Sequence, residues 1–237
     1  MENVKSINDY SKGFRDGIPI GLGYLSVSFT FGMMAVNMGL PVWVTVLISM
    51  TNLTSAGQFA GIGLICAGAP YMEMALAQLV INLRYALMSL SLSQKTDKSM
   101  NIFHRILISF GITDEVFAVA SGQPCEIGRS YMYGLITAPY FGWALGTFIG
   151  AAAGTLLPAT MRSALNIAIY GMFIAIIIPP AKHNNSILKV IIFSVVTSCI
   201  LRYTPILNQL SGGFAIIICT IVASTLGAKL FPVREDE

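Results

Sequence analysis

Long apolar stretches separated by short polar segments dominate this chain. Five stretches contain no Lys, Arg, Asp or Glu: the residues between Asp16 and Glu73, Ser130–Met161, Ser163–Ala181, Val190–Leu201 and Tyr203–Ala228. A helix rises 1.5 Å per residue, so about 20 apolar residues cross the hydrocarbon core of a bilayer. The pattern therefore predicts an all-α integral membrane protein.

We expect about seven transmembrane helices, at least one of them discontinuous. They are Ile18–Met38, Val42–Cys66, Tyr71–Ser93, Tyr131–Leu156, Ser163–Ile178, Ile187–Leu201 and Gly212–Phe231. Residues 1–17 are expected to form a polar N-terminal tail, and residues 18–237 a single transmembrane domain. The segment Ile102–Ala120 is too charged for a lipid-facing span, so we expect a bent or partly inserted element with Thr113 as a helix N-cap.

The segment Val42–Cys66 is apolar except at its centre, where Thr51–Phe59 carries hydroxyls, amides and small residues. Each apolar flank is long enough for only about half a crossing. Polar backbone at that depth is tolerated where it is buried in protein or lines a cavity. We therefore expect a discontinuous helix whose break faces an aqueous pocket and binds a small solute. The candidate residues are Asn52, Ser55, Ala56, Gly57, Gln58 and Phe59. The alternative is hydrogen bonding between helices.

Lysine and arginine in the short loops predict the orientation, because they are enriched on the cytoplasmic side. Lys95, Lys98 and Arg105 mark one side, and the later loop cations fall on that side too. With seven crossings the C-terminus is cytoplasmic and the N-terminus outside, although the basic tail favours the opposite placement. If Val42–Cys66 instead re-enters the membrane, the N-terminus moves inside and this conflict disappears.

Two short motifs suggest an internal repeat. Leu83-Arg84-Tyr85 recurs as Leu201-Arg202-Tyr203, and Leu40-Pro41 recurs as Leu157-Pro158 at nearly the same spacing. The repeat units would be 18–93 and 131–203, followed by a last span at 212–231. With three crossings each, the two copies would be inverted relative to each other, as in many secondary transporters.

Composition supports the membrane class and excludes several others. The chain is 55% hydrophobic and 11% charged, with a net charge of +3 and a mean hydropathy of +0.72. It has no basic cluster of the kind that binds nucleic acid. Its four cysteines lack metal-like spacing, and no common catalytic motif occurs, so we expect no metal, no cofactor and no enzymatic activity.

Charged residues within apolar sequence are the next candidates. Arg84 lies well inside the third span, where it could hold a substrate carboxylate, with Asn82 beside it. Alternatively, Arg84 could form a structural pair with Glu115 or Glu73, or snorkel toward the membrane surface. Asp114 and Glu115 follow the predicted cap Thr113, which suits the helix dipole. Their functional alternatives are proton coupling or pairing with Arg84.

Four glycines fall at four-residue intervals in one span: Gly142, Gly146, Gly150 and Gly154. Small residues at this spacing let another helix approach closely, and in lipid such contact drives association. The face they form is predicted to pack either inside this chain or against a partner subunit.

Four motifs together resemble the AzlC-like branched-chain amino acid permeases. In order they are Gly13-Phe14-Arg15-Asp16-Gly17-Ile18-Pro19, Ser55-Ala56-Gly57-Gln58-Phe59, Asn82-Leu83-Arg84-Tyr85 and Thr113-Asp114-Glu115. The resemblance covers nearly the whole chain. Tyr85 stands where family members usually have histidine, so a titrating role at this position does not carry over.

The resemblance implies a multi-pass protein of the bacterial inner membrane that exports branched-chain amino acids, and often methionine, by alternating access. It also implies a small four-span membrane subunit of the AzlD type. Two other classes stay open on the residues alone. The chain could be a structural or assembly subunit whose partner carries the transport path, or it could be a channel.

Overall fold

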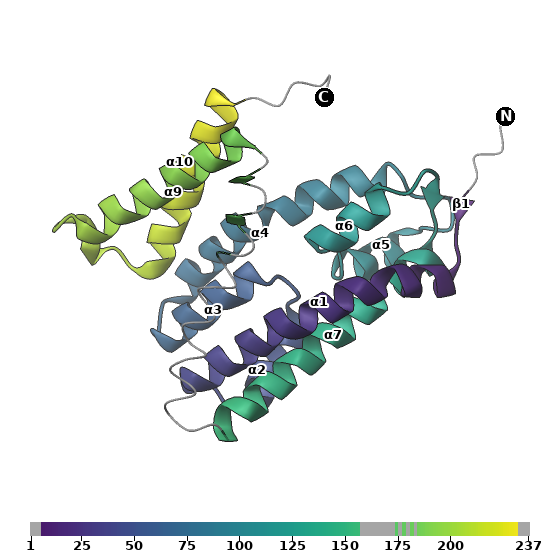
Figure 1. The fold of residues 1–237 in the computed structure, drawn as a ribbon, viewed down its shortest axis with the longest axis horizontal. Coiled ribbons are helices and arrows are strands. Elements are labelled where there is room, and N and C mark those ends of the chain that lie inside the picture. Colours follow the sequence, from purple (N-terminus) through teal and green to yellow (C-terminus); the bar gives the residue numbers. More distant parts are fainter. Residues whose placement is uncertain (1–5, 157–173, 175–176, 179–180, 183, 232–237) are drawn as a thin grey trace. The chain divides into compact units, whose positions relative to one another are not determined.

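The computed structural model describes residues 6–156, 174, 177, 178, 181, 182 and 184–231. These residues are almost entirely helical (Figure 1). The helices are α1 (Tyr10–Asn37), α2 (Val42–Thr51), α3 (Ala56–Cys66), α4 (Tyr71–Ser93), α5 (Ile102–Ser109), α6 (Asp114–Ser121), α7 (Arg129–Leu156), α9 (Asn185–Tyr203) and α10 (Gly212–Leu230), with a short 3₁₀ turn at Leu207–Gln209. Two short strands, β1 (Ser6–Ile7) and β2 (Glu126–Ile127), pair in parallel.

Five described helices are long and apolar enough to cross a membrane: α1, α4, α7, α9 and α10. Helices α2 and α3 are apolar but have only 10 and 11 residues. The described residues thus support several crossings, while the number seven stays a prediction. The expected span Ser163–Ile178 lies almost wholly outside the described residues.

Helix α1 begins at Tyr10, so residues 10–17 extend the first helix instead of forming a tail. Asp9 caps the helix, because its carboxylate accepts a hydrogen bond from the Ser11 N–H at 2.9 Å. Gly13 and Gly17 then pack against the backbone of α7. Polar composition alone did not reveal this, because the contacts that hold residues 10–17 come from a helix more than a hundred residues later.

The chain divides into two compact units. Unit 1 comprises Met1–Phe59 and Asn82–Arg162, and unit 2 comprises Ala60–Ile81 and Ser163–Glu237. This division does not follow the predicted repeat units 18–93 and 131–203. Unit 1 contains α1, α2 and α5–α7, whereas α9 and α10 pack together in unit 2.

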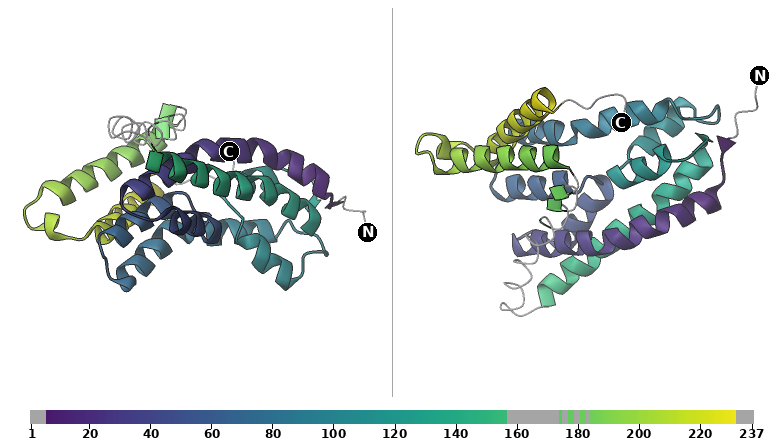
Figure 2. Two further views of the ribbon diagram at one scale, coloured as in Figure 1. Left: turned by 90° about the horizontal axis from the view of Figure 1, so that it is seen from below. Right: turned by 45° about the horizontal axis from the view of Figure 1, so that its top comes forward.

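Helices α1 and α7 lie side by side along their whole described length (Figure 2). Early in both helices, Gly13 packs against the backbone of Tyr131. Late in both helices, Gly150 packs against the backbone of Phe29. The contacts advance in the same direction along both chains, so the two helices are parallel.

The four regularly spaced glycines form this contact. Gly142 faces the backbone of Gly21, Gly146 faces Leu25 and Ser28, and Gly154 faces Met33. An added Cβ at Gly142, Gly146 or Gly150 would overlap atoms of α1. The glycine face is therefore covered within this chain, which leaves it closed to a partner subunit.

One end of unit 1 is tied together by hydrogen bonds around β1 and β2, and we call it the strand end. The Asp97 N–H donates to the Ile127 carbonyl at 3.0 Å, just after α4. The Ser130 N–H, at the start of α7, donates to Asn8 Oδ1 at 2.7 Å, just before α1. Helices α1 and α7 therefore start at the strand end, and α4 finishes there.

The parallel course of α1 and α7 disagrees with the predicted inversion of the two repeat units, of which they are the first helices. An inverted copy would run the other way. The inversion followed from counting Val42–Cys66 as a complete crossing. The helix directions do not support that count.

The charged segment between α4 and α7 is bent as predicted. Helix α5 ends at Ser109 and α6 begins at Asp114. Thr113 is the N-cap of α6, and its hydroxyl accepts a hydrogen bond from the Val116 N–H at 3.4 Å. Both helices have only eight residues, which is too short for a crossing.

Candidate functional site

The chain between α2 and α3 is a short non-helical break with a defined conformation. Asn52 ends α2 in an extended conformation, with φ at −146°, and its side-chain oxygen accepts a hydrogen bond from the Thr54 hydroxyl at 2.8 Å. Ser55 has φ at +46°, in the left-handed region. A non-glycine residue there is held at a cost of about 1–2 kcal/mol. Such strain is typical of functional segments.

Gln58 ties the break to α2 and α7. Its Nε2 donates to Ser49 Oγ at 3.0 Å, and Ser49 Oγ lies 2.7 Å from Thr147 Oγ1. The residue is only 1% exposed. Its other amide atom, Oε1, is buried and has no hydrogen-bond partner among the described residues. An unpaired buried acceptor costs free energy, so this oxygen is a candidate ligand contact.

The other predicted residues of the break differ in exposure. Gly57 is buried, and its N–H donates to the Thr54 carbonyl at 3.2 Å, so this N–H is used within the chain. Phe59 is buried edge-on against Phe31, with ring centroids 5.4 Å apart. Ala56 is exposed. Residues 52–59 line none of three cavities formed by described residues, so the predicted aqueous pocket beside them stays a prediction.

Arg84 forms an ion pair with Asp114, which joins α4 to the first turn of α6. Its Nη2 also donates to the Tyr85 hydroxyl at 3.1 Å. The Arg84 and Asp114 side chains are 44% and 45% exposed, so the pair is accessible from outside the unit. Asn82 is half-buried on the same helix, two residues before Arg84.

The other acids predicted as partners of Arg84 have different contacts. Glu73 is buried in unit 2, where its carboxylate accepts hydrogen bonds from the Ser211 hydroxyl at 2.5 Å and the Gly213 N–H at 2.9 Å. It therefore anchors the start of α10. Glu115 accepts a hydrogen bond from the hydroxyl of Tyr24. Asp114 and Glu115 both lie in the first turn of α6, where negative charges interact favourably with the helix dipole, as predicted.

Two tyrosines connect the short helices to the long ones. The Tyr85 hydroxyl donates to the Thr54 carbonyl at 3.3 Å, which joins α4 to the break. The Tyr24 hydroxyl lies 2.6 Å from Thr113 Oγ1, which joins α1 to the cap of α6. The break and the cap of α6 are therefore each linked to a long helix by a tyrosine hydroxyl.

Trp143 on α7 was not a candidate from sequence. It packs edge-on against Tyr24, with ring centroids 5.1 Å apart, and shares a buried cluster with Tyr24 and Leu53 of the break. It is 2% exposed, and its indole Nε1 has no hydrogen-bond partner among the described residues. A lone tryptophan in an apolar span offered no sequence signal that distinguishes a donor from core packing.

Asp114 lies outside the five long helices, in α6. Its carboxylate pairs with the Arg84 guanidinium, and Glu115 follows it in the first turn of the same helix. Protonation of Asp114 would remove its attraction for Arg84.

These contacts place the break between α2 and α3 and the cap of α6 at the same level of unit 1. The break and the cap are contacted by residues near the middle of three long helices. These residues are Tyr24, Arg84 and Trp143. The site thus includes an accessible guanidinium, two carboxylates, and an amide oxygen and an indole N–H that have no hydrogen-bond partner among the described residues. Such a set can recognise a small molecule that carries both charges.

Residues 19–157 match the model of the AzlC protein family, and the matched region contains every one of these groups. The chain belongs to the AzlC family. The inner membrane protein YgaZ of Escherichia coli K12 is 27% identical over 186 residues, which cover 75% of this chain and 76% of YgaZ. Membership of this family indicates a membrane protein with a transporter-like role.

Two further relatives are named only as uncharacterized membrane proteins. The one from Archaeoglobus fulgidus is 31% identical over 191 residues, covering 78% of this chain and 82% of its own length. The one from Helicobacter pylori J99 is 26% identical over 188 residues, covering 76% and 81%. No solved structure matches the chain.

Proposed function

We propose that this AzlC family chain is a secondary transporter that exports branched-chain amino acids across the bacterial inner membrane. The observation that carries the proposal is the meeting of the Arg84–Asp114 pair with the break at Asn52–Ser55, halfway along the long helices. Carriers commonly bind substrate at the midplane, beside interrupted helices. The name of the Escherichia coli relative supports the inner membrane as the location.

We further propose that Val42–Cys66 is a discontinuous segment that re-enters the membrane. Helix α1 leaves the strand end and α4 returns to it. The chain between α1 and α4 must therefore begin and end on the far side. The segment α5–α6 likewise begins and ends at the strand end. Two pairs of short helices would then enter from opposite sides, with the break and Thr113 at their tips.

This arrangement removes the conflict in the charge pattern. With the strand end in the cytoplasm, the N-terminal tail and the loop with Lys95, Lys98 and Arg105 lie on the same side. Six crossings would suffice, counting the expected span Ser163–Ile178, and the C-terminus would also be cytoplasmic.

Labelling with a membrane-impermeant maleimide tests the re-entrant segment. In a chain with the other cysteines replaced by serine, we expect native Cys66 and an introduced Met38→Cys thiol to be labelled in intact cells. Both positions are exposed and flank the segment. A Lys98→Cys thiol at the strand end is the control, and we expect it to react only after lysis. Labelling of Met38→Cys and Cys66 from opposite sides would show a complete crossing instead.

The substrate is a zwitterion with an aliphatic side chain, and the site offers a partner for each charge. Arg84 would take the carboxylate through its planar fork. The ammonium group needs acceptors, and Gln58 Oε1 is a buried acceptor without a partner among the described residues. Asn52, Ser55 and Asn82 are the other candidates for this role. Buried aromatic side chains such as Phe59 would favour an aliphatic tail.

Proton coupling follows from the ion pair. A proton on Asp114 would release Arg84 to bind the substrate carboxylate, and loss of that proton would restore the pair and expel the substrate. The two ligands of Arg84 would thus be mutually exclusive. Alternating access would move the tips of α2–α3 and α5–α6 relative to the long helices.

Proteoliposomes test the transport function. We also propose a small four-span AzlD-type subunit as the partner of this chain. We expect vesicles containing both chains to move labelled leucine with saturable kinetics, and an imposed pH gradient to change the rate. A chain that gives no flux, while the partner alone transports leucine, would be a structural subunit. Flux that never saturates would indicate a channel.

A further inference from the structure

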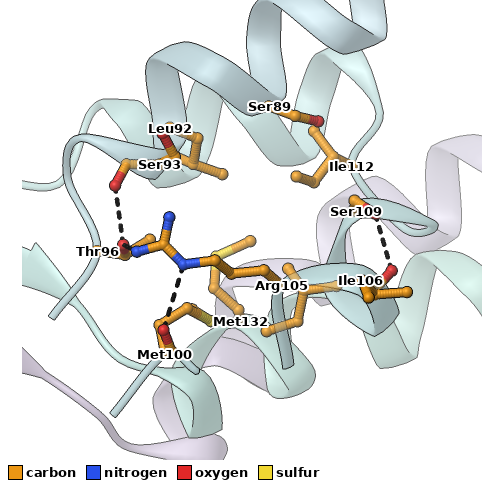
Figure 3. A pocket seen from close by; sticks show the side chains of 11 residues that line it. Ser89, Leu92, Ser93, Thr96, Met100, Arg105, Ile106, Ser109, Ile112 and Met132 are labelled. Carbon is orange, nitrogen blue, oxygen red and sulfur yellow. Dashed lines mark hydrogen bonds between the residues drawn. The ribbon is translucent and has the colours of Figure 1, made fainter. Parts of the chain in front are cut away.

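Unit 1 contains a cavity of about 270 Å³ that the transport proposal does not use. It lies between the last turns of α4, helix α5 and the start of α7 (Figure 3). Its wall is mostly apolar, with one cation and a few hydroxyls. The lining residues that matter are Leu92, Ile108, Ile112, Met132, Ser89 and Arg105.

Arg105 is held rigidly at the wall of this cavity. Its Nε donates to the Met100 carbonyl at 3.2 Å, and its Nη2 donates to Thr96 Oγ1 at 3.0 Å. Figure 3 shows the bond from Arg105 to Met100 and the end of the guanidinium beside Thr96. No hydrogen bond joins Nη1 to another described residue. A fixed guanidinium with an unused N–H group is suited to bind an anion.

We propose that this cavity binds a small aliphatic carboxylate. The carboxylate would lie against Arg105 Nη1, and the aliphatic chain would contact Leu92, Ile112 and Met132. None of the described lining residues is an acid, so an ammonium group would have hydroxyls but no anionic partner there. The cavity therefore favours a plain carboxylate over the zwitterionic amino acids proposed for the other site. Its volume is below the range of about 300–1,000 Å³ typical of drug-sized ligands, which fits a short branched chain.

A ligand in this cavity would influence the transport site through the segments that line the cavity. Ile112 lines the cavity and lies one residue before Thr113, the cap of α6. Ser89 lines it from α4, the helix that carries Arg84. A ligand between these segments would fix their separation and so bias the Arg84–Asp114 pair. An anion joined to an aliphatic chain could come from a free carboxylate or from an anionic lipid with one acyl chain inserted.

Binding to the purified full-length chain tests the proposal independently of transport. The chain is placed in phosphatidylcholine nanodiscs and titrated with 4-methylpentanoate by calorimetry, with 4-methylpentan-1-ol as the uncharged comparison. We expect the carboxylate to bind and the alcohol to bind at least tenfold more weakly. Arg105→Gln is expected to weaken carboxylate binding at least tenfold, because hydrogen bonds to charged groups are worth about 1.5–3 kcal/mol.

Two further variants separate a lost site from a damaged fold. Ser89→Leu fills the cavity while keeping both bonds of Arg105, so we expect it to abolish binding. Lys98→Gln removes a nearby cation that does not line the cavity, and it should bind like the unmodified chain. Weaker binding in phosphatidylglycerol nanodiscs would identify anionic lipid as a competing occupant of the same site. Equal binding by the Arg105→Gln protein, or none by the unmodified chain in either lipid, would overturn the proposal.

Discussion

Arg84→Gln is expected to reduce leucine export to the level of cells lacking this chain, while the protein still inserts into the membrane. Glutamine keeps a polar side chain of similar helix propensity, although a shorter one, and removes the positive charge. It could not form the charge-assisted, bidentate pair that arginine makes with a carboxylate. The arginine side chain is 44% exposed, so its loss leaves no cavity in the core. Release of leucine from preloaded cells measures the effect.

Arg202→Gln is the matched control, because Arg202 occupies the second Leu-Arg-Tyr motif at the end of α9. We expect export by that variant to be normal. Asp114→Asn provides a second comparison. It frees Arg84 permanently, so substrate should still bind to purified protein while the response of transport to pH is lost. Normal export by a well-expressed Arg84→Gln protein would remove Arg84 from the site.

The sequence predicted the helical class and the bent charged segment, because each depends on local features. Apolar runs predict spans, and Thr113 followed by two acids predicts a helix start. The partner of Arg84 was one of several acids that the sequence left open. Only the folded chain shows that Asp114 is the acid in contact with it.

The buried groups of the site were harder to foresee. Tyr24, Ser49 and Trp143 are single polar or aromatic residues in apolar helices, and sequence spacing does not show which neighbour each one meets. The same is true of helix direction. Four spaced glycines predict that two helices pack closely, but not whether these helices run parallel or antiparallel. The parallel course of α1 and α7 appears only from paired contacts such as Gly13 with Tyr131.

Gly150→Leu is expected to prevent this chain from forming a stable, monodisperse protein in detergent. Its Cβ would overlap the backbone of Phe29, which cannot turn aside as a flexible side chain would. The whole of α1 would have to move away from α7, and the neighbouring glycine contacts at Gly146 and Gly154 would open with it. Apolar helices in lipid associate through close van der Waals contact, so a separation of the backbones removes the main attraction between them.

Gly23→Leu is the matched control for that substitution. Gly23 lies on the same helix α1, but apart from its chain neighbours and the backbone of its own helix no described atom lies within 4 Å of the position its Cβ would take. The leucine there should be tolerated, and size-exclusion elution and thermal unfolding of the two variants can be compared directly. If both proteins behaved alike, close packing of α1 on α7 would not be what holds unit 1 together. The site would then lose the frame that aligns Tyr24 with Trp143.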